Sequence, residues 1–147
     1  MIPEIKRLVK DSNIIMVGDN KAREMEDAVE CDITKLCCKI PFITSALLTK
    51  YVDLVISVDS GVLHASGCYD TPKIALLGNS TKENITKHFR NCYTFEANCY
   101  CAPCFKTIFC IEECEKDELT GSCLCMGQGI SLFDIINKVV EIRRNSK

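Results

Sequence analysis

The chain has 147 residues, 47% of them hydrophobic, which is enough for one globular domain with a hydrophobic core. Its 18 basic and 20 acidic residues give a net charge of -2, so it lacks the basic surplus typical of nucleic-acid binding. No apolar stretch reaches the roughly 20 residues of a membrane span, and the N-terminus has no apolar signal-peptide segment. We therefore expect one domain in the cytoplasm, with no nucleic-acid partner and no transmembrane segment.

The first third of the chain predicts three helices, each with apolar residues spaced along one face. These residues are Ile5, Leu8 and Val9, then Ala22, Met25 and Val29, then Phe42, Ala46, Leu47 and Tyr51. Pro41 marks the start of the third helix. The apolar run at 14–17, closed by Gly18, predicts a strand between the first two helices.

The middle of the chain continues this alternation. Apolar runs at 54–58 and 73–77 predict two further strands, and a helix is expected between them from Gly61. Strands that alternate with helices are typical of a parallel sheet covered by helices on both faces. The fold class expected is therefore α/β, with a Rossmann-like parallel sheet flanked by helices.

The last part of the chain contains a region without a clear pattern, from about Thr81 to Gly129. Ser131 and Asp134 then form a capping-box signature for a final helix that we expect to pack on the sheet. Its apolar stripe is Leu132, Ile135, Ile136, Val139 and Val140.

The segment Asp59-Ser60-Gly61-Val62-Leu63-His64 follows the strand at 54–58 and opens a helix. N–H groups in the first turn of a helix lack partners, and a glycine allows a phosphate to approach the main chain, so this turn is a candidate anion site. In an open parallel sheet it lies at the carboxyl edge, where ligands bind. A Ser-Gly turn can also be a simple helix cap, and both interpretations stay open from the residues alone.

These residues, together with Pro72 and Leu76-Leu77-Gly78, resemble glycosyltransferase family 9, the heptosyltransferases of lipopolysaccharide core assembly and their relatives. The similarity extends upstream to Ile14–Gly18 and downstream to Cys101-Ala102-Pro103-Cys104 and Cys125-Met126. It implies the donor-binding, C-terminal half of a GT-B enzyme with two Rossmann-like domains. Residues 1–147 would then form one nucleotide-sugar binding domain, with a Cys-rich insertion at about 92–129.

The resemblance also implies a set of donor-binding residues. Ser60 and Gly61 would bind the diphosphate, Asp59 would orient the turn, and His64 would support either the helix start or the donor. Gly18, Glu24, Lys39 and Ile40 would lie on the nucleotide side. For three of these residues a structural role stays open: a strand end for Gly18, a solvated charge for Glu24 and a hydrogen-bonded helix residue for His64.

The reaction implied is inverting transfer of a sugar, a heptose by family majority, from ADP-heptose to a lipopolysaccharide core or similar glycan. Main-chain donors, rather than a divalent metal, would stabilise the leaving diphosphate, and no cofactor is expected. The general base belongs to an N-terminal acceptor domain with no counterpart here, so no catalytic residue is assigned. The chain would then be a truncated gene product, a fragment, or a subunit completed by another chain, and alone it is expected to bind nucleotide weakly and to transfer no sugar. The setting expected is the cytoplasm, including the surface of the inner membrane.

Seven of the twelve cysteines lie between Cys99 and Cys125. Spacings in this region allow a four-thiolate zinc site, disulfides, or reduced thiols that close a loop, and we expect no metal. The cysteines concerned are Cys101, Cys104, Cys110, Cys114, Cys123 and Cys125. They support an alternative function, a non-catalytic nucleotide-sugar or partner-binding module with a zinc-stabilised, Cys-rich loop.

Overall fold

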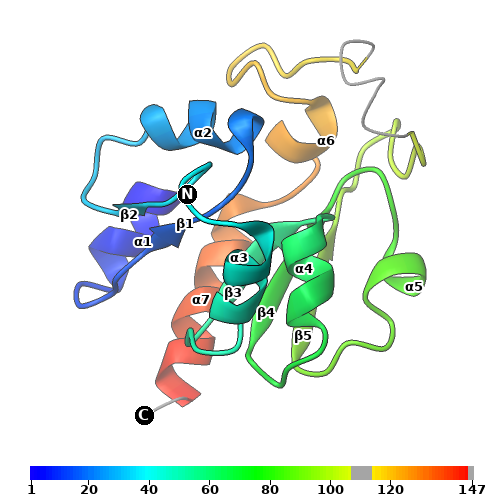
Figure 1. Cartoon of the computed structure of the whole chain (residues 1–147). Coiled ribbons are helices and arrows are strands. Elements are labelled where there is room, and N and C mark those ends of the chain that lie inside the picture. Colours follow the sequence, from blue (N-terminus) through cyan, green and yellow to red (C-terminus); the bar gives the residue numbers. More distant parts are fainter. Residues whose placement is uncertain (107–113, 146–147) are drawn as a thin grey trace. The chain divides into compact units, whose positions relative to one another are not determined.

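The computed structural model describes residues 1–106 and 114–145, which form two compact units (Figure 1). Among the described residues, unit 1 comprises residues 1–48 and 132–145, and unit 2 comprises residues 49–106 and 114–131. Each unit contains a parallel sheet with helices beside it. The expected α/β class with Rossmann-like parallel strands is therefore confirmed, whereas the single donor-binding domain stays a prediction.

Unit 1 contains two strands and four helices. These are α1 (Ile2–Leu8), β1 (Ile15–Met16), α2 (Asn20–Asp27), β2 (Thr34–Lys35), α3 (Phe42–Leu48) and α7 (Leu132–Asn145). The strands β1 and β2 pair in parallel, with Ile15 opposite Thr34. Helices α1 and α7 pack together, but their predicted apolar faces are buried only in part, because Leu8 and Leu132 are 46% and 42% exposed. The residues buried on the two helices and just after α1 are Ile5, Val9, Ile135, Val139 and Ile142.

Helix α2 departs from the predicted apolar face. Met25 is 61% exposed, whereas the neighbouring Glu26 is only 1% exposed. Glu26 tolerates burial because its Oε1 accepts a hydrogen bond from the main-chain N–H of Cys37, at 3.0 Å. Although burial alone raises the pKa of a carboxyl, hydrogen bonds from Cys37 hold the pKa of Glu26 below its usual value.

Unit 2 contains a three-stranded parallel sheet in the order β3-β4-β5. Its elements are β3 (Val55–Val58), α4 (Gly61–Ser66), β4 (Lys73–Leu77), α5 (Lys82–Ile85), β5 (Cys92–Glu96) and α6 (Leu124–Gly127). The central strand, β4, is buried along its whole length. Helix α4 lies against the sheet, where Leu63 packs with Ala75 and Leu77 (Figure 1).

We expected a region without a clear pattern from about Thr81 to Gly129, and this prediction was wrong where α5, β5 and α6 form. Strand β5 pairs with β4 over its full length, with Cys92 opposite Lys73 and Glu96 opposite Leu77. The sequence of β5, Cys-Tyr-Thr-Phe-Glu, contains no continuous apolar run. Four of its five residues are half-buried, and Glu96 is exposed. An edge strand can fold in this way because its main chain supplies the pairing, whatever its side chains.

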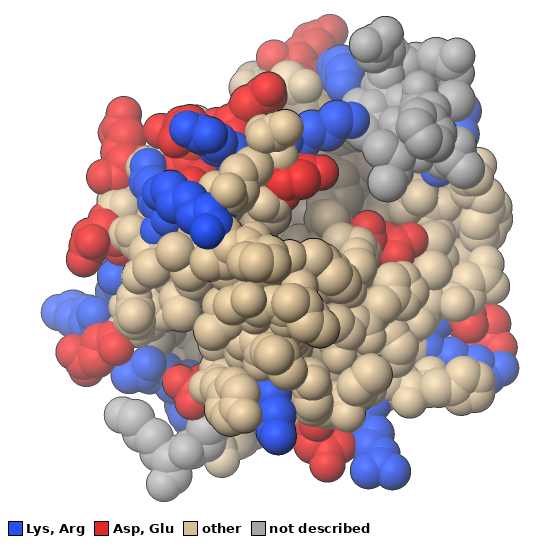
Figure 2. Space-filling view, viewed as in Figure 1, with Lys and Arg blue, Asp and Glu red and all other residues tan. Residues whose placement is uncertain are grey.

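On the face shown in Figure 2, basic and acidic side chains lie mostly toward the edges of the view, whereas residues other than Lys, Arg, Asp and Glu cover most of its centre. In the described part of the chain, none of the helices combines the length and the apolar character that a membrane span requires.

Candidate functional site

The candidate site is built around the turn that joins β3 to α4. Ser60 has an extended backbone, with φ of -157° and ψ of 163°, and its Oγ accepts a hydrogen bond from the N–H of Leu63 at 3.3 Å. Ser60 is therefore the N-cap of α4, and Gly61 is the first helical residue. In a helix capped this way, the N–H groups of Gly61 and Val62 have no partner within the helix. The predicted motif thus presents main-chain donors at the carboxyl edge of the sheet.

A second serine holds the Ser60 hydroxyl. Ser57 Oγ donates a hydrogen bond to the carbonyl of Val58 at 3.0 Å and lies 2.9 Å from Ser60 Oγ. A hydroxyl has a single proton, so with the Ser57 proton on Val58, the proton between the two serines comes from Ser60. A ligand that takes a hydrogen bond from Ser60 must therefore replace Ser57 as the acceptor.

Asp59 joins the loops that follow β3 and β4. Its Oδ1 lies 3.1 Å from Nε2 of His64, and its Oδ2 accepts a hydrogen bond from Ser80 Oγ at 3.3 Å. His64 also packs edge-on against Phe89, with ring centroids 6.0 Å apart. The structure thus brings Asp59, Ser60, Gly61 and His64 together within unit 2, and their roles in donor binding stay predictions.

The other predicted site residues, Gly18, Glu24, Lys39 and Ile40, lie in unit 1. Glu24 is exposed on α2, Lys39 is exposed with its Nζ donating to the carbonyl of Lys35 at 2.8 Å, and Ile40 is half-buried. Their roles in donor binding stay predictions.

Gly18 has a packing role in unit 1. A Cβ at this position would come within 2.3 Å of the Cβ of Ala22 on α2. Its carbonyl also accepts a hydrogen bond from the N–H of Cys38 at 2.9 Å. The residue at position 18, two positions after β1, must therefore be small because α2 begins so close to it.

Gly78 has a comparable role in unit 2, directly after β4. A Cβ there would come within 2.7 Å of the Sγ of Cys125 and 3.2 Å of the Sδ of Met126. The Leu76-Leu77-Gly78 and Cys125-Met126 segments, which we singled out separately in the sequence, are thus in contact. Their contact is a matter of packing between β4 and α6.

Sequence reasoning missed Ser57 and Ser80, the two serines that hold Ser60 and Asp59. The only signal for Ser57 was a polar residue inside the apolar run at 54–58. Ser80 carried no signal, because its partner lies 21 positions away in the chain and depends on the parallel pairing of β3 and β4.

The described cysteines of the Cys-rich region cluster in unit 2. Cys99 and Cys101 have their Sγ atoms 3.5 Å apart, and the hydrogen bond between them, with burial, raises the pKa of the Cys101 thiol. Burial and a hydrogen bond with Cys123 raise the pKa of Cys114, and burial followed by the charges of nearby thiols raises that of Cys125. Neutral thiols are thus favoured.

In residues 1–106 and 114–145, no three or more ligand-type side chains come together in a way that could hold a metal ion. Cys110 lies outside the described residues. The choice among zinc, disulfides and free thiols therefore stays a prediction.

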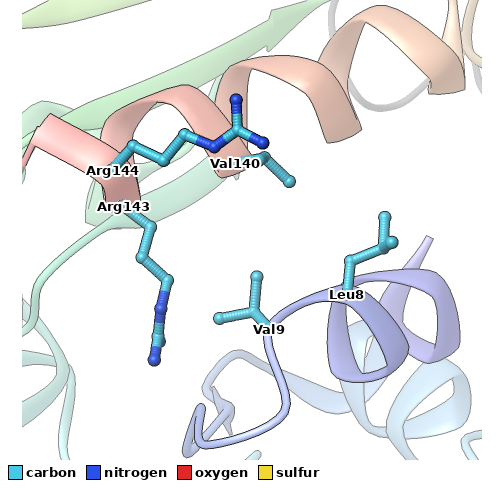
Figure 3. Close-up of a pocket in the computed structure, with 5 residues that line it drawn as sticks. All are labelled: Leu8, Val9, Val140, Arg143 and Arg144. Atoms are coloured by element: carbon cyan, nitrogen blue, oxygen red, sulfur yellow. The ribbon is translucent and has the colours of Figure 1, made fainter.

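A pocket elsewhere, in unit 1, involves none of the predicted site residues (Figure 3). It lies between α1 and α7 and is lined by Leu8, Val9, Val140, Arg143 and Arg144.

Comparison with known proteins identifies the family. The profile of glycosyltransferase family 9 (heptosyltransferase) matches residues 4–114, a span that includes β1 to β5 and the whole Asp59–His64 motif. The match ends before α6 and α7, so the similarity proposed for Cys125-Met126 and the final helix stays a prediction. Searches of the curated proteins and of the solved structures gave no match. Because the profile covers most of the chain, and because the motif lies in the strand-turn-helix context expected for it, this chain belongs to glycosyltransferase family 9.

Proposed function

We propose that this chain binds a nucleoside-diphosphate sugar and serves as the donor-binding domain of a glycosyltransferase. The observation that supports the proposal most strongly is the Asp59-Ser60-Gly61 turn, in which a capped helix begins at the carboxyl end of β3. Membership of family 9 supports the class of reaction. The turn indicates where on the chain the diphosphate would bind.

The diphosphate would be bound by the N–H groups at the start of α4 and by the hydroxyl of Ser60. Gly61 has no side chain to stand between a phosphate oxygen and the main chain. As the sugar is transferred, negative charge develops on the departing diphosphate, and preoriented hydrogen-bond donors stabilise such charge without reorganisation. This arrangement requires no divalent metal.

For the remainder of the donor, we propose that Gly18, Glu24, Lys39 and Ile40 bind the nucleoside. The donor proposed is ADP-heptose and the acceptor is a lipopolysaccharide core or similar glycan, which the family resemblance favours. Such a donor and a lipid-linked acceptor would meet at the cytoplasmic surface of the inner membrane.

Calorimetry with ADP, UDP and GDP, each in the presence of EDTA, tests the proposal. We expect ADP to bind most tightly of the three, with the same affinity when magnesium replaces EDTA. ADP-heptose should compete with ADP more effectively than ADP-glucose does. A strict requirement for magnesium, or no binding of any of the three nucleotides, would contradict the proposal.

Two variants of α4 localise the binding. Gly61→Val places a side chain over the first-turn N–H groups and should weaken ADP binding at least tenfold. Ser66→Ala is the matched control: Ser66 is buried in the same helix and donates only to the carbonyl of Leu63, at 2.6 Å. Its removal should lower stability without changing ADP affinity. Equal loss of affinity in both variants would indicate general destabilisation instead.

A further inference from the structure

We propose that Ser80 is a positioning residue for the diphosphate site: it fixes the carboxylate of Asp59, and Asp59 in turn orients the ring of His64. The inference rests on the proposed function, because the diphosphate is the ligand that the positioned groups would meet. Ser80 lies 21 positions beyond Asp59 and outside the family motif.

Sheet topology explains why Ser80 reaches the motif. Strands β3 and β4 are parallel neighbours, so the loops that follow them leave the sheet at the same edge. Asp59 directly follows β3, and Ser80 follows β4 by three residues. The Ser80 side chain is buried, and a buried hydroxyl requires a hydrogen-bond partner. Its partner is Oδ2 of Asp59.

Asp59 transmits this constraint to His64. An ionised carboxylate only accepts hydrogen bonds, so the 3.1 Å contact with Oδ1 requires a proton on Nε2 of His64. The ring of His64 also packs edge-on against Phe89. Held in this way, neutral His64 keeps its proton on Nε2 and presents Nδ1 as the second polar atom of the ring.

Electrostatics explains why the position of Asp59 matters for an anionic ligand. A carboxylate next to a diphosphate repels it, and this repulsion is smaller when hydrogen-bond donors contact both oxygens of the carboxylate. With Ser80 on one oxygen and His64 on the other, both oxygens of Asp59 are engaged. Without Ser80, one oxygen loses its donor, and the carboxylate becomes free to rotate about its terminal torsion. Both the repulsion of the diphosphate and the disorder of the His64 ring then increase.

The test combines ADP calorimetry with nitrogen-15 NMR of the histidine rings, which reports the nitrogen that holds the proton. The chain has two histidines, so His88 provides an internal reference in every spectrum. We expect Ser80→Ala to weaken ADP binding about tenfold, because the carboxylate of Asp59 then repels the diphosphate more strongly and the His64 ring is less ordered. It should also change the His64 ring signals, even without ligand, and leave those of His88 unchanged.

Two further variants separate positioning from folding. Ser80→Thr keeps the hydroxyl and should restore both ADP affinity and the His64 signals, whereas Ser80→Cys keeps the size with a weaker donor and should give intermediate values. Ser66→Ala, which removes another buried hydroxyl of unit 2, should change neither.

The outcomes separate the two proposals. If the unmodified protein binds ADP and Ser80→Ala binds it equally well with unchanged His64 signals, the positioning role is overturned and the proposed function stands. The positioning role is also overturned if a folded Ser80→Thr variant restores neither the ADP affinity nor the His64 signals. If the unmodified protein binds no nucleotide, the proposed function falls, and the role of Ser80 in ligand binding falls with it.

Discussion

The hydroxyl oxygens of Ser57 and Ser60 lie 2.9 Å apart, at the point where β3 passes into the turn before α4. The Ser60 hydroxyl therefore makes two hydrogen bonds in the free protein: it caps α4 by accepting from the N–H of Leu63, and it bonds to the hydroxyl of Ser57. Its orientation is therefore defined in the free protein. A phosphate oxygen that replaces Ser57 as the acceptor would meet a hydroxyl already in place, which lowers the entropy lost on binding.

Substitution of each serine should give different results. Ser60→Ala removes the cap, which should lower stability by about 1 kcal/mol, and it removes a hydrogen bond to phosphate, which should weaken ADP binding by about tenfold to a hundredfold. Ser57→Ala removes both the competing acceptor and the contact that orients Ser60; these effects oppose each other, so ADP affinity should stay within about threefold of the unmodified value. Calorimetry and thermal unfolding measure the two effects. A folded Ser60→Ala variant that binds ADP as tightly as the unmodified protein would show that Ser60 does not contact the ligand.

The contact between Gly78 and α6 predicts a rescue of stability. Gly78→Ala places a methyl group 2.7 Å from the Sγ of Cys125, so we expect a loss of about 1–3 kcal/mol in the free energy of unfolding. Adding Cys125→Ala removes that sulfur and should recover part of the loss. Denaturant unfolding of the two single variants and the double variant measures the coupling. Simple additivity would contradict the packing described.

Burial of Cys37 predicts a stability change at alkaline pH. Burial and the neighbouring Glu26 raise the pKa of Cys37 to about 12. An unfolded thiol releases its proton above about pH 8.5, so the folded protein then binds more protons than the unfolded chain. Cys37 should thus stabilise the fold fully below pH 8.5 and lose this contribution as the pH rises toward 12.

Unfolding free energies measured across this range check the effect. The decline should be shallower in Cys37→Ala, by at most about 1.4 kcal/mol per pH unit, the value for a single proton. Cys68→Ala is the matched control, because Cys68 is an exposed cysteine. If the unmodified protein and Cys37→Ala decline in parallel, the thiol of Cys37 is not protected in the way the structure indicates.

The cysteine cluster should be free of metal. We base this on the spacing of the cysteines, among which only Cys101 and Cys104 have the Cys-x-x-Cys separation typical of zinc sites. Native mass spectrometry of protein purified without chelator should therefore give the mass of the chain alone. A mass increase equal to one zinc ion per chain would contradict the expectation and support a four-thiolate site. Thiol titration after denaturation would find twelve thiols if every cysteine is reduced.

The motif and its surroundings could be predicted from the sequence because local signals agreed there. Apolar runs predicted β3 and β4, and the Asp59-Ser60-Gly61 segment predicted a turn and a helix start, all of which the structure contains. The family also followed from these residues, and the profile match confirms it. Strand β4 is buried along its whole length, and strands buried on both faces give a strong apolar signal in the sequence.

Other features depended on contacts that a local pattern does not contain. Strand β5 was missed because its residues are half-buried and mixed in polarity, and its pairing with β4 is what defines it. Burial of Glu26 in place of Met25 follows from a hydrogen bond with Cys37, eleven positions later. The link from Ser80 to Asp59 likewise required the order of the strands.

The central claim is that the turn between β3 and α4 binds the diphosphate of the donor, and a nitrogen-15 NMR titration with ADP in EDTA tests it most directly. Hydrogen bonds from main-chain N–H groups to phosphate should shift the amide signals of Ser60, Gly61 and Val62 most strongly, with saturation at the affinity found by calorimetry. AMP, which lacks the second phosphate, should shift them less. Signals that shift instead around Leu8 and Val140, while those of Ser60 to Val62 stay unchanged at saturation, would contradict the account.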